Sequence, residues 1–283
     1  MKKILAIILM SAMIISVSGC SAAQNTSQDT SKNTAQDTSN DSQNRESIYQ
    51  VALLQSLTQG YYDGIIKVSE LKEHGDIGIG TFEGVNGEMI VLDGKVYQAL
   101  GDGSVQEADN DETVPFSNVT FFDKDITSDI SDIKNIDALK ENLDKTVNEN
   151  GRNMFYFIKI NGTFNKMNVR SELKQKKPYK SLDKALATDQ REFNYKDIKG
   201  TVVALYCPDY MDGLNTPGWH FHFVSDDRNK GGHILELAFD NAKAEMDKTS
   251  GFEMKLSDNK TFQKLELAKD VSQAIKKVET NDD

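Results

Sequence analysis

The sequence predicts an α+β fold built mainly from antiparallel β-sheet, and three patterns support this prediction. Short apolar runs flank Asn86-Gly87 and Asp93-Gly94, pairs that are strong signals for two-residue hairpin turns. Residues 218–224 place histidines and aromatic residues at alternate positions, as in a strand with two different faces. Residues 132–148 instead carry apolar side chains at helical spacing. We therefore expect mixed, largely antiparallel sheets with short helices.

The first 45 residues are expected to lie outside the folded part. Lys2 and Lys3 precede an apolar stretch, residues 4–17, that is shorter than the ~20 apolar residues of a spanning helix. Residues 1–20 end in Ser-Gly-Cys and resemble a bacterial lipoprotein signal, which predicts an exported protein anchored by a lipid on Cys20 and facing outward. An ordinary secretory signal is the alternative. Residues 21–45 are almost wholly polar and predict a disordered linker.

From residue 46 onward, strand and helix patterns alternate. Runs rich in β-branched and aromatic residues between turn signals predict strands at 47–57, 78–82, 88–92, 95–99, 118–122, 154–160, 201–207, in a histidine-bearing hairpin and at 252–256. Helices are predicted at 68–74, 132–148, 182–189 and 269–278. This part could form one large domain or two small ones. We divide it into two packed sub-domains, a β-rich one at 46–165 and one that carries a metal site at 166–283.

Charge and cysteine content narrow the possible partners. The chain has a net charge of −11, and removal of residues 1–19 leaves 31 basic against 44 acidic residues, a net charge of −13. This acidity argues against nucleic acid or an anionic membrane surface as a partner, so membrane contact is expected only through lipidated Cys20. Cys207 then remains as the one other thiol. No intrachain disulfide is possible, and Cys207 is predicted to be a buried core residue.

Three of the four histidines lie close together in the sequence. His220 and His222 share one face of the predicted strand, and a polar turn at 225–232 leads to His233. A hairpin would bring the third imidazole beside the first two, forming a site for Zn²⁺ or a similar divalent ion with an open coordination position. The His-x-His pair by itself would also suit a solvated surface. The fourth histidine, His74, lies far away in the sequence.

Other cofactor motifs are missing from the sequence. There is no P-loop, no dinucleotide fingerprint and no His-Glu-x-x-His helix. Gly101-Asp102-Gly103 is similar to the start of the thiamine diphosphate motif, but the paired asparagines of that motif do not follow, so we interpret it as a tight turn. We therefore expect a metal ion and no organic cofactor.

Several stretches together resemble the α-acetolactate decarboxylase family from residue 47 nearly to the end of the chain. They are Tyr49-Gln50-Val51, Gly60-Tyr61-Tyr62-Asp63-Gly64, residues 74–82, Gly87-Glu88-Met89 with the residues up to Gly94, and the histidine hairpin. The resemblance implies a two-domain fold, a homodimer and a zinc ion held by His220, His222 and His233. It further implies catalytic roles for Glu88 and for Arg170 in the Arg-Ser stretch. The family's second glutamate, near its C-terminus, matches Glu279 by spacing alone.

The implied reaction is the decarboxylation of (2S)-2-acetolactate to (R)-acetoin and CO₂. The substrate is a small anionic 2-hydroxy-3-keto acid, and loss of CO₂ leaves an electron pair that needs a sink at the ketone. Chelation of the hydroxyl and ketone oxygens by Zn²⁺ would stabilise the enediolate. Glu88 is the expected proton donor, and Arg170 would orient the substrate carboxylate or the developing oxyanion. Other divalent transition ions suit three histidines as well.

Two other functions fit parts of the same sequence. A cupin-like metal protein would use the His-x-His pair with a nearby carboxylate, supplied by Asp226 or Asp227. A lipid-anchored receptor for a metal or a solute would fit the leader and the linker without any turnover. Replacement of the two aspartates tests the first alternative, and replacement of Glu88 tests the second.

Overall fold

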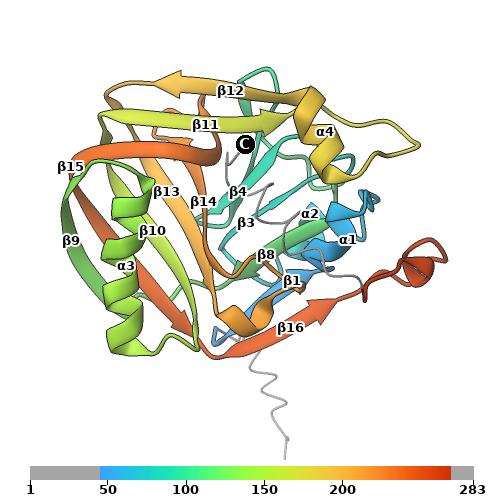
Figure 1. Cartoon of the computed structure of the whole chain (residues 1–283), viewed down its shortest axis with the longest axis horizontal. Coiled ribbons are helices and arrows are strands. Elements are labelled where there is room, and N and C mark those ends of the chain that lie inside the picture. The colour runs from blue at the N-terminus through green and yellow to red at the C-terminus, as the bar shows by residue number, and fades with distance from the viewer. Residues whose placement is uncertain (1–44, 269–283) are drawn as a thin grey trace, which may run out of the picture. The chain divides into compact units, whose positions relative to one another are not determined.

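Two facing β-sheets form the body of the protein in the computed structural model, which describes residues 45–268 (Figure 1). The first sheet has the strand order β16-β1-β8-β3-β4-β5-β6, and its neighbours are antiparallel apart from the parallel pair β1 and β16. Its strands are β1 (Ser47–Val51), β3 (Ile77–Thr81), β4 (Glu88–Leu92), β5 (Lys95–Ala99), β6 (Val105–Glu107), β8 (Phe116–Thr120) and β16 (Gly251–Lys255).

The second sheet carries the histidine hairpin and is antiparallel throughout. Its main order is β10-β13-β14-β15-β11-β12, while β15 also pairs with β9 and β10. Its strands are β9 (Ile126–Ile133), β10 (Phe155–Phe164), β11 (Lys166–Glu172), β12 (Gln190–Tyr195), β13 (Ile198–Cys207), β14 (Gly218–Ser225) and β15 (Gly231–Thr249). The expectation of largely antiparallel sheet is thus confirmed, and the described part of the chain is mostly β.

Short elements cover or join the sheets. A small two-stranded sheet pairs β2 (Ile66–Lys67) with β7 (Thr113–Val114). The helices are α1 (Leu54–Thr58), α2 (Val68–Leu71), α3 (Ile136–Asn150) and α4 (Leu182–Asp189), with short 3₁₀ turns at Asp209–Met211 and Phe262–Lys264. Within residues 45–268, no helix has both the length and the apolar character needed to cross a membrane. The predicted signal, most of the linker, the helix at 269–278 and Glu279 lie outside the described residues.

The apolar core has three main layers. Side chains such as Ile79 and Ile90 of the first sheet meet Phe157 and Leu205 of the second, and this layer fills the space between the sheets. The opposite face of the second sheet packs against α3, and the outer face of the first sheet packs against α2 and its neighbours. Cys207 is buried in the layer between the sheets, as predicted, and burial raises the pKa of its thiol.

Several helices and strands begin or end at other residues than predicted, and local interactions explain the differences. The strand predicted at 47–57 ends at Val51, because the chain turns at Ala52 with a φ of 55° and then forms α1. The helix predicted at 132–148 begins later, at Ile136, because the side chain of Asn135 caps it by accepting a hydrogen bond from Ala138 N at 2.8 Å. The strand β9 just before it was missed because its sequence is mostly polar. The helix at 182–189 agrees with its prediction at both ends.

The predicted boundary between sub-domains, at residue 165, falls inside the second sheet. β10 precedes this boundary and β11 follows it, yet both pair with β15. β16 moreover returns to the first sheet from the C-terminal side of the chain. The sheets therefore divide the chain differently from the prediction, because the 19-residue strand β15 joins segments from both predicted halves.

Asp247 in β15 is a carboxyl group buried between the sheets, and it makes stability depend on pH. It accepts hydrogen bonds from Asp123 N at 3.2 Å and from Thr249 Oγ1 at 3.1 Å. Burial raises its pKa from 3.8 to about 7 against the opposing effect of these hydrogen bonds. A carboxyl group with a raised pKa stabilises the fold most below its unfolded pKa, and this contribution is lost as the pH rises from about 4 to 7.

We expect Asp247→Asn to remove this dependence, because the amide stays neutral and can still accept from Asp123 N. Thermal unfolding at pH 5 and pH 8 checks it. The melting temperature of the variant minus that of the parent protein should be larger at pH 8 than at pH 5. An equal difference at both pH values would contradict the assignment.

Candidate metal centre and active site

The strand β14 presents its two histidines to the space between the sheets. Trp219, Phe221 and Phe223 alternate with them and pack in the core on the α3 side, where the Trp219 indole donates to Asp144 at 2.8 Å. His220 and His222 therefore face the first sheet, which confirms the two-faced strand predicted from the sequence. His222 is fully buried, and His220 is partly exposed.

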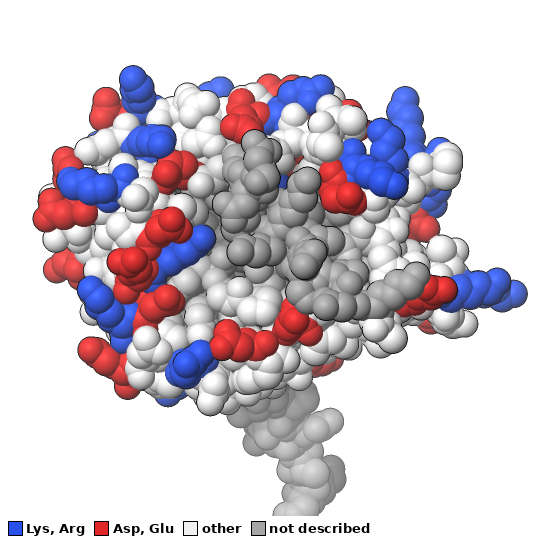
Figure 2. Space-filling model, viewed as in Figure 1, with Lys and Arg blue, Asp and Glu red and all other residues white. Residues whose placement is uncertain are grey.

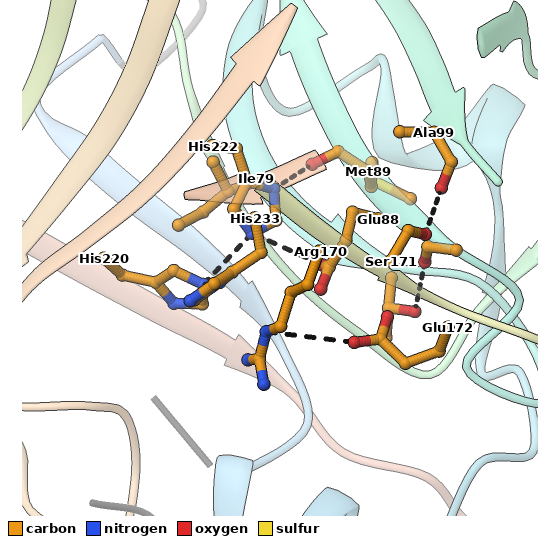
Figure 3. Close-up of polar contacts among 12 residues, drawn as sticks. Ile79, Glu88, Met89, Ala99, Arg170, Ser171, Glu172, His220, His222 and His233 are labelled. Atoms are coloured by element: carbon orange, nitrogen blue, oxygen red, sulfur yellow. Dashed lines mark hydrogen bonds and ion pairs between the residues drawn. The ribbon is translucent and has the colours of Figure 1, made fainter. Parts of the chain in front are cut away.

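The hairpin between β14 and β15 brings the third histidine to this pair. His233 lies directly opposite His222 in the strand register. The turn is closed by a hydrogen bond from Ser225 N to Lys230 O at 2.8 Å. One ring nitrogen from each of the three histidines then lies within 4.8 Å of the others (Figure 3). The structure thus gathers the predicted triad, which sequence spacing alone left as a hypothesis.

Hydrogen bonding orients the triad for metal binding. His222 donates through Nδ1 to the carbonyl of Met89 in β4 at 2.8 Å, so its Nε2 carries a free lone pair that points at the other two rings. Burial, followed by the charge of Arg170, lowers the pKa of His220 to about 3. Burial also lowers the pKa of His222 well below 6.5. Both rings are therefore neutral, which is the form that binds metal.

The donor atoms fit a divalent cation. His220 Nε2 lies 3.1 Å from His222 Nε2 and 3.0 Å from His233 Nδ1. A single N–H on His220 cannot point at both neighbours. At least one of these two short N···N contacts therefore lacks a well-directed hydrogen bond. A cation at the centre would satisfy all three lone pairs. Tetrahedral Zn²⁺ with Zn–N bonds of about 2.0–2.1 Å would need N···N separations of roughly 3.4 Å, a few tenths of an ångström longer than the two distances from His220 Nε2.

Glu88 reaches the triad from the first sheet. It is the first residue of β4 and lies on the same face as Ile90, which packs between the sheets. The preceding turn needs glycine at Gly87, where φ is 83° and an added Cβ would lie 2.3 Å from the carbonyl oxygen of Ala99. Glu88 is only 8% exposed, and its Oε2 lies 3.4 Å from His222 Nε2.

Arg170 reaches the same place from β11, where it is paired in register with His233. Its Nη1 donates to Gln190 Oε1 at 3.1 Å, and its Nε lies 3.9 Å from Glu172 Oε1. Arg170 and Glu172 are both buried, and Figure 3 shows them on the same side of the strand. Sequence reasoning missed Glu172. The signal was available, because a residue two positions after Arg170 in a strand must share its face.

A pocket joins these side chains to an apolar wall. Its polar end contains Thr81, Glu88, Arg170, Glu172, His220 and His233. Its apolar end is formed by leucines of α1 and α4 together with two residues of the first sheet and its turn: Leu54, Leu57, Leu182, Leu186, Val85 and Phe116. Such a site suits a small molecule with several oxygens and short alkyl groups. The wall also strengthens charge interactions at the polar end by limiting water.

The cupin-like alternative loses its carboxylate ligand in this geometry. Asp227 accepts hydrogen bonds from Ser225 Oγ at 2.6 Å and from Asn229 N at 3.1 Å, and so stabilises the hairpin turn. Asp226 is exposed. The cluster of metal-ligating groups found in the described part of the chain contains the three histidines and neither aspartate.

The sequence and the fold are both similar to those of alpha-acetolactate decarboxylases. The sequence model of the alpha-acetolactate decarboxylase family matches residues 48–269. The chain is 39% identical to the alpha-acetolactate decarboxylase of Methanosarcina mazei over 82% of its own length and 80% of the relative's. It is 34% identical to that of Bacillus licheniformis over 84% and 93%, respectively. The crystal structure of alpha-acetolactate decarboxylase from Bacillus subtilis strain 168 is similar with a TM-score of 0.79 and 32% identity, covering 83% of this chain and 99% of that one.

Proposed function

The chain belongs to the alpha-acetolactate decarboxylase family, and from this premise we propose that it forms (R)-acetoin and CO₂ from (2S)-2-acetolactate with a metal ion held by His220, His222 and His233. Membership makes the protein an enzyme, a carboxy-lyase. The observation that carries the metal-dependent mechanism is the convergence of three imidazoles, Glu88 and Arg170 on one pocket. When bound, Zn²⁺ would act as a Lewis acid toward the hydroxyl and ketone oxygens of the substrate.

Arg170 is the proposed partner of the substrate carboxylate. The guanidinium is held by Gln190 at 3.1 Å, and its Nε has no hydrogen-bond acceptor among the described residues. Its N–H groups can therefore hold the carboxylate in one orientation before the bond between C2 and the carboxyl carbon breaks. The apolar wall of the pocket limits water around this charge pair.

Glu88 is the proposed proton donor. Departure of CO₂ leaves an electron pair that the ketone must accept, and formation of acetoin then requires one proton on carbon. The Glu88 carboxyl group lies beside His222 and points into the pocket, within reach of a molecule bound at the triad. Its place at the first residue of a strand, after a turn that needs glycine, fixes its position relative to the histidines.

Arg170→Lys should weaken substrate binding more than it slows the chemical step. Lysine keeps a positive charge but cannot reproduce the planar fork that Gln190 and a carboxylate share. Loss of a charge-assisted hydrogen bond predicts a fall in kcat/KM of about 10- to 100-fold, mostly through KM. Steady-state kinetics measures the split, with metal content as the check that the triad is intact. An unchanged KM would remove Arg170 from the binding role.

Zinc, the homodimer and the lipid anchor complete the proposal. Three histidine ligands with an open position are typical of catalytic zinc, although they accept other ions. The homodimer follows from family membership, and the anchor follows from the sequence around Cys20. Metal analysis, the mass of the assembly in solution and mass spectrometry of the mature N-terminus test these points separately.

The decisive experiment measures metal content and acetoin formation on the same purified sample. Racemic acetolactate should yield acetoin and CO₂. An enzyme that accepts only the (2S) enantiomer will consume about half of this substrate. Removal of the metal by a chelator should stop turnover, and Zn²⁺ should restore it. Metal-loaded protein that forms no acetoin would refute the proposed function and favour a metal or solute receptor.

A further inference from the structure

We propose that the loop between β11 and α4, with the start of α4, forms a lysine rim that attracts the anionic substrate to the pocket. The lysine rim is defined by five side chains: Lys174, Lys176, Lys177, Lys180 and Lys184. This inference rests on the proposed function, because it concerns how the same pocket captures its substrate. It assigns a role to residues that take no part in the chemistry.

The rim is a local reversal of charge in an acidic protein. Residues 173–190 contain five lysines against two aspartates, a net charge of +3 in a chain whose net charge is −11. Figure 2 shows basic side chains gathered in the region where Figure 1 places α4 and the loop before it. The negative field of the whole protein opposes the approach of a carboxylate substrate, and positive charge near the pocket would offset it.

The loop that carries the rim lies next to the pocket, because the residues before and after it line the pocket. Glu172 immediately precedes the loop, and Leu182 and Leu186 follow it, and all three line the pocket. Near the start of the loop, Gln175 N donates to Gly84 O at 2.8 Å. Gly84 is followed by Val85, which lines the pocket from the turn between β3 and β4. The loop is thus held at the pocket wall by both of its ends.

Three of the five lysines are available to act on a ligand in solution. Lys177 pairs with Asp63 at 2.6 Å and Lys180 lies 4.0 Å from Asp189, so these two have anionic neighbours. Lys174, Lys176 and Lys184 are exposed, and none of them forms an ion pair within residues 45–268. Exposed lysines without partners contribute little to stability, so their clustering at the pocket calls for another explanation.

The expected consequence is a higher local concentration of substrate at the pocket. Clefts edged by charge of one sign can raise encounter with an oppositely charged ligand by about 10- to 1000-fold, and the effect falls steeply with ionic strength. The Debye length is about 8 Å at physiological salt and about 3 Å at 1 M, so salt should abolish the effect. Arg170 would take over the carboxylate only after entry into the buried part of the pocket.

The test compares two triple variants that remove the same charge. Lys174→Gln, Lys176→Gln and Lys184→Gln together remove the free lysines of the rim. The control combines Lys145→Gln on α3 with Lys196→Gln, just after β12, and Lys199→Gln, at the start of β13; these three lysines are also exposed. At low salt, kcat/KM of the rim variant should fall by about 10-fold with kcat unchanged, and the difference should vanish near 1 M salt. Inhibition by acetoin, which is neutral, should stay the same.

Three outcomes would overturn the inference. One is an unchanged kcat/KM in the rim variant, and another is an equal fall in the control, which would indicate net charge rather than the rim. The third is weaker binding to vesicles of anionic phospholipid with unchanged kcat/KM, which would make the rim a membrane contact. Wild-type protein that forms no acetoin would refute the proposed function and the rim together. Active wild type with unaffected kinetics in the rim variant would overturn the rim alone.

Discussion

His222→Ala is expected to abolish both metal binding and acetoin formation. His222 is fully buried, donates to Met89 O at 2.8 Å and directs Nε2 toward the other two histidines. Loss of a residue that merely orients a ligand costs about 10- to 100-fold in metal affinity, so loss of a ligand should cost more than that. The variant also removes the anchor between β14 and β4.

Metal analysis by mass spectrometry and an acetoin assay, run on the same sample, measure both effects. The matched control is His74→Ala, because His74 is the one histidine outside the triad and stacks on Tyr49 with ring centroids 3.6 Å apart. The control should keep its metal and its activity even if stability falls slightly. Far-UV circular dichroism separates loss of metal from loss of fold. A folded His222→Ala protein with full metal content would remove His222 from the ligand set.

Glu88→Gln is expected to keep the metal and lose turnover. Glutamine has nearly the same shape as glutamate and can occupy the same space beside His222, but it has no carboxyl proton to deliver. General acid–base catalysis contributes about 10²- to 10⁴-fold to rate, so kcat should fall by a factor in this range. KM should change much less, because Arg170 and the triad remain.

This second prediction separates an enzyme from a metal or solute receptor. Single-turnover kinetics with metal-loaded protein isolates the chemical step, and Glu107→Gln on the exposed strand β6 serves as the control for loss of one negative charge. Turnover that survives in Glu88→Gln would assign the proton donor to another group. Loss of metal in the same variant would instead make Glu88 part of the metal site.

Some of the site could be predicted because it depends on local pattern. Period-two alternation puts His220 and His222 on one face of β14 whatever lies around it, and the polar turn after Ser225 brings His233 back beside them. The same rule would have placed Glu172 beside Arg170. The neutral state of His220 and His222 could not be predicted, since it depends on burial between two sheets and on the nearby charge of Arg170.

Other predictions differ from the structure where pairing between distant strands determines the fold. β9 is mostly polar in sequence and forms a strand because it lies along the edge of β15. The predicted division at residue 165 falls within one sheet for the same reason, since β15 pairs with strands from both sides of that boundary. Hydrophobic periodicity reports burial along one segment, but it carries no information on which distant segment supplies the hydrogen-bonding partner.

The sequence by itself determined the family, the largely antiparallel sheets and the histidine triad, because each follows from residue order or from short-range periodicity. Only the tertiary structure decided how Glu88, from the first sheet, and Arg170, from β11, meet the hairpin at one pocket. These residues are more than fifty positions from His222, and their approach depends on two sheets packing face to face through a shared apolar layer. The placement of the lysine rim beside that pocket has the same origin, since a run of lysines in sequence shows charge and not location.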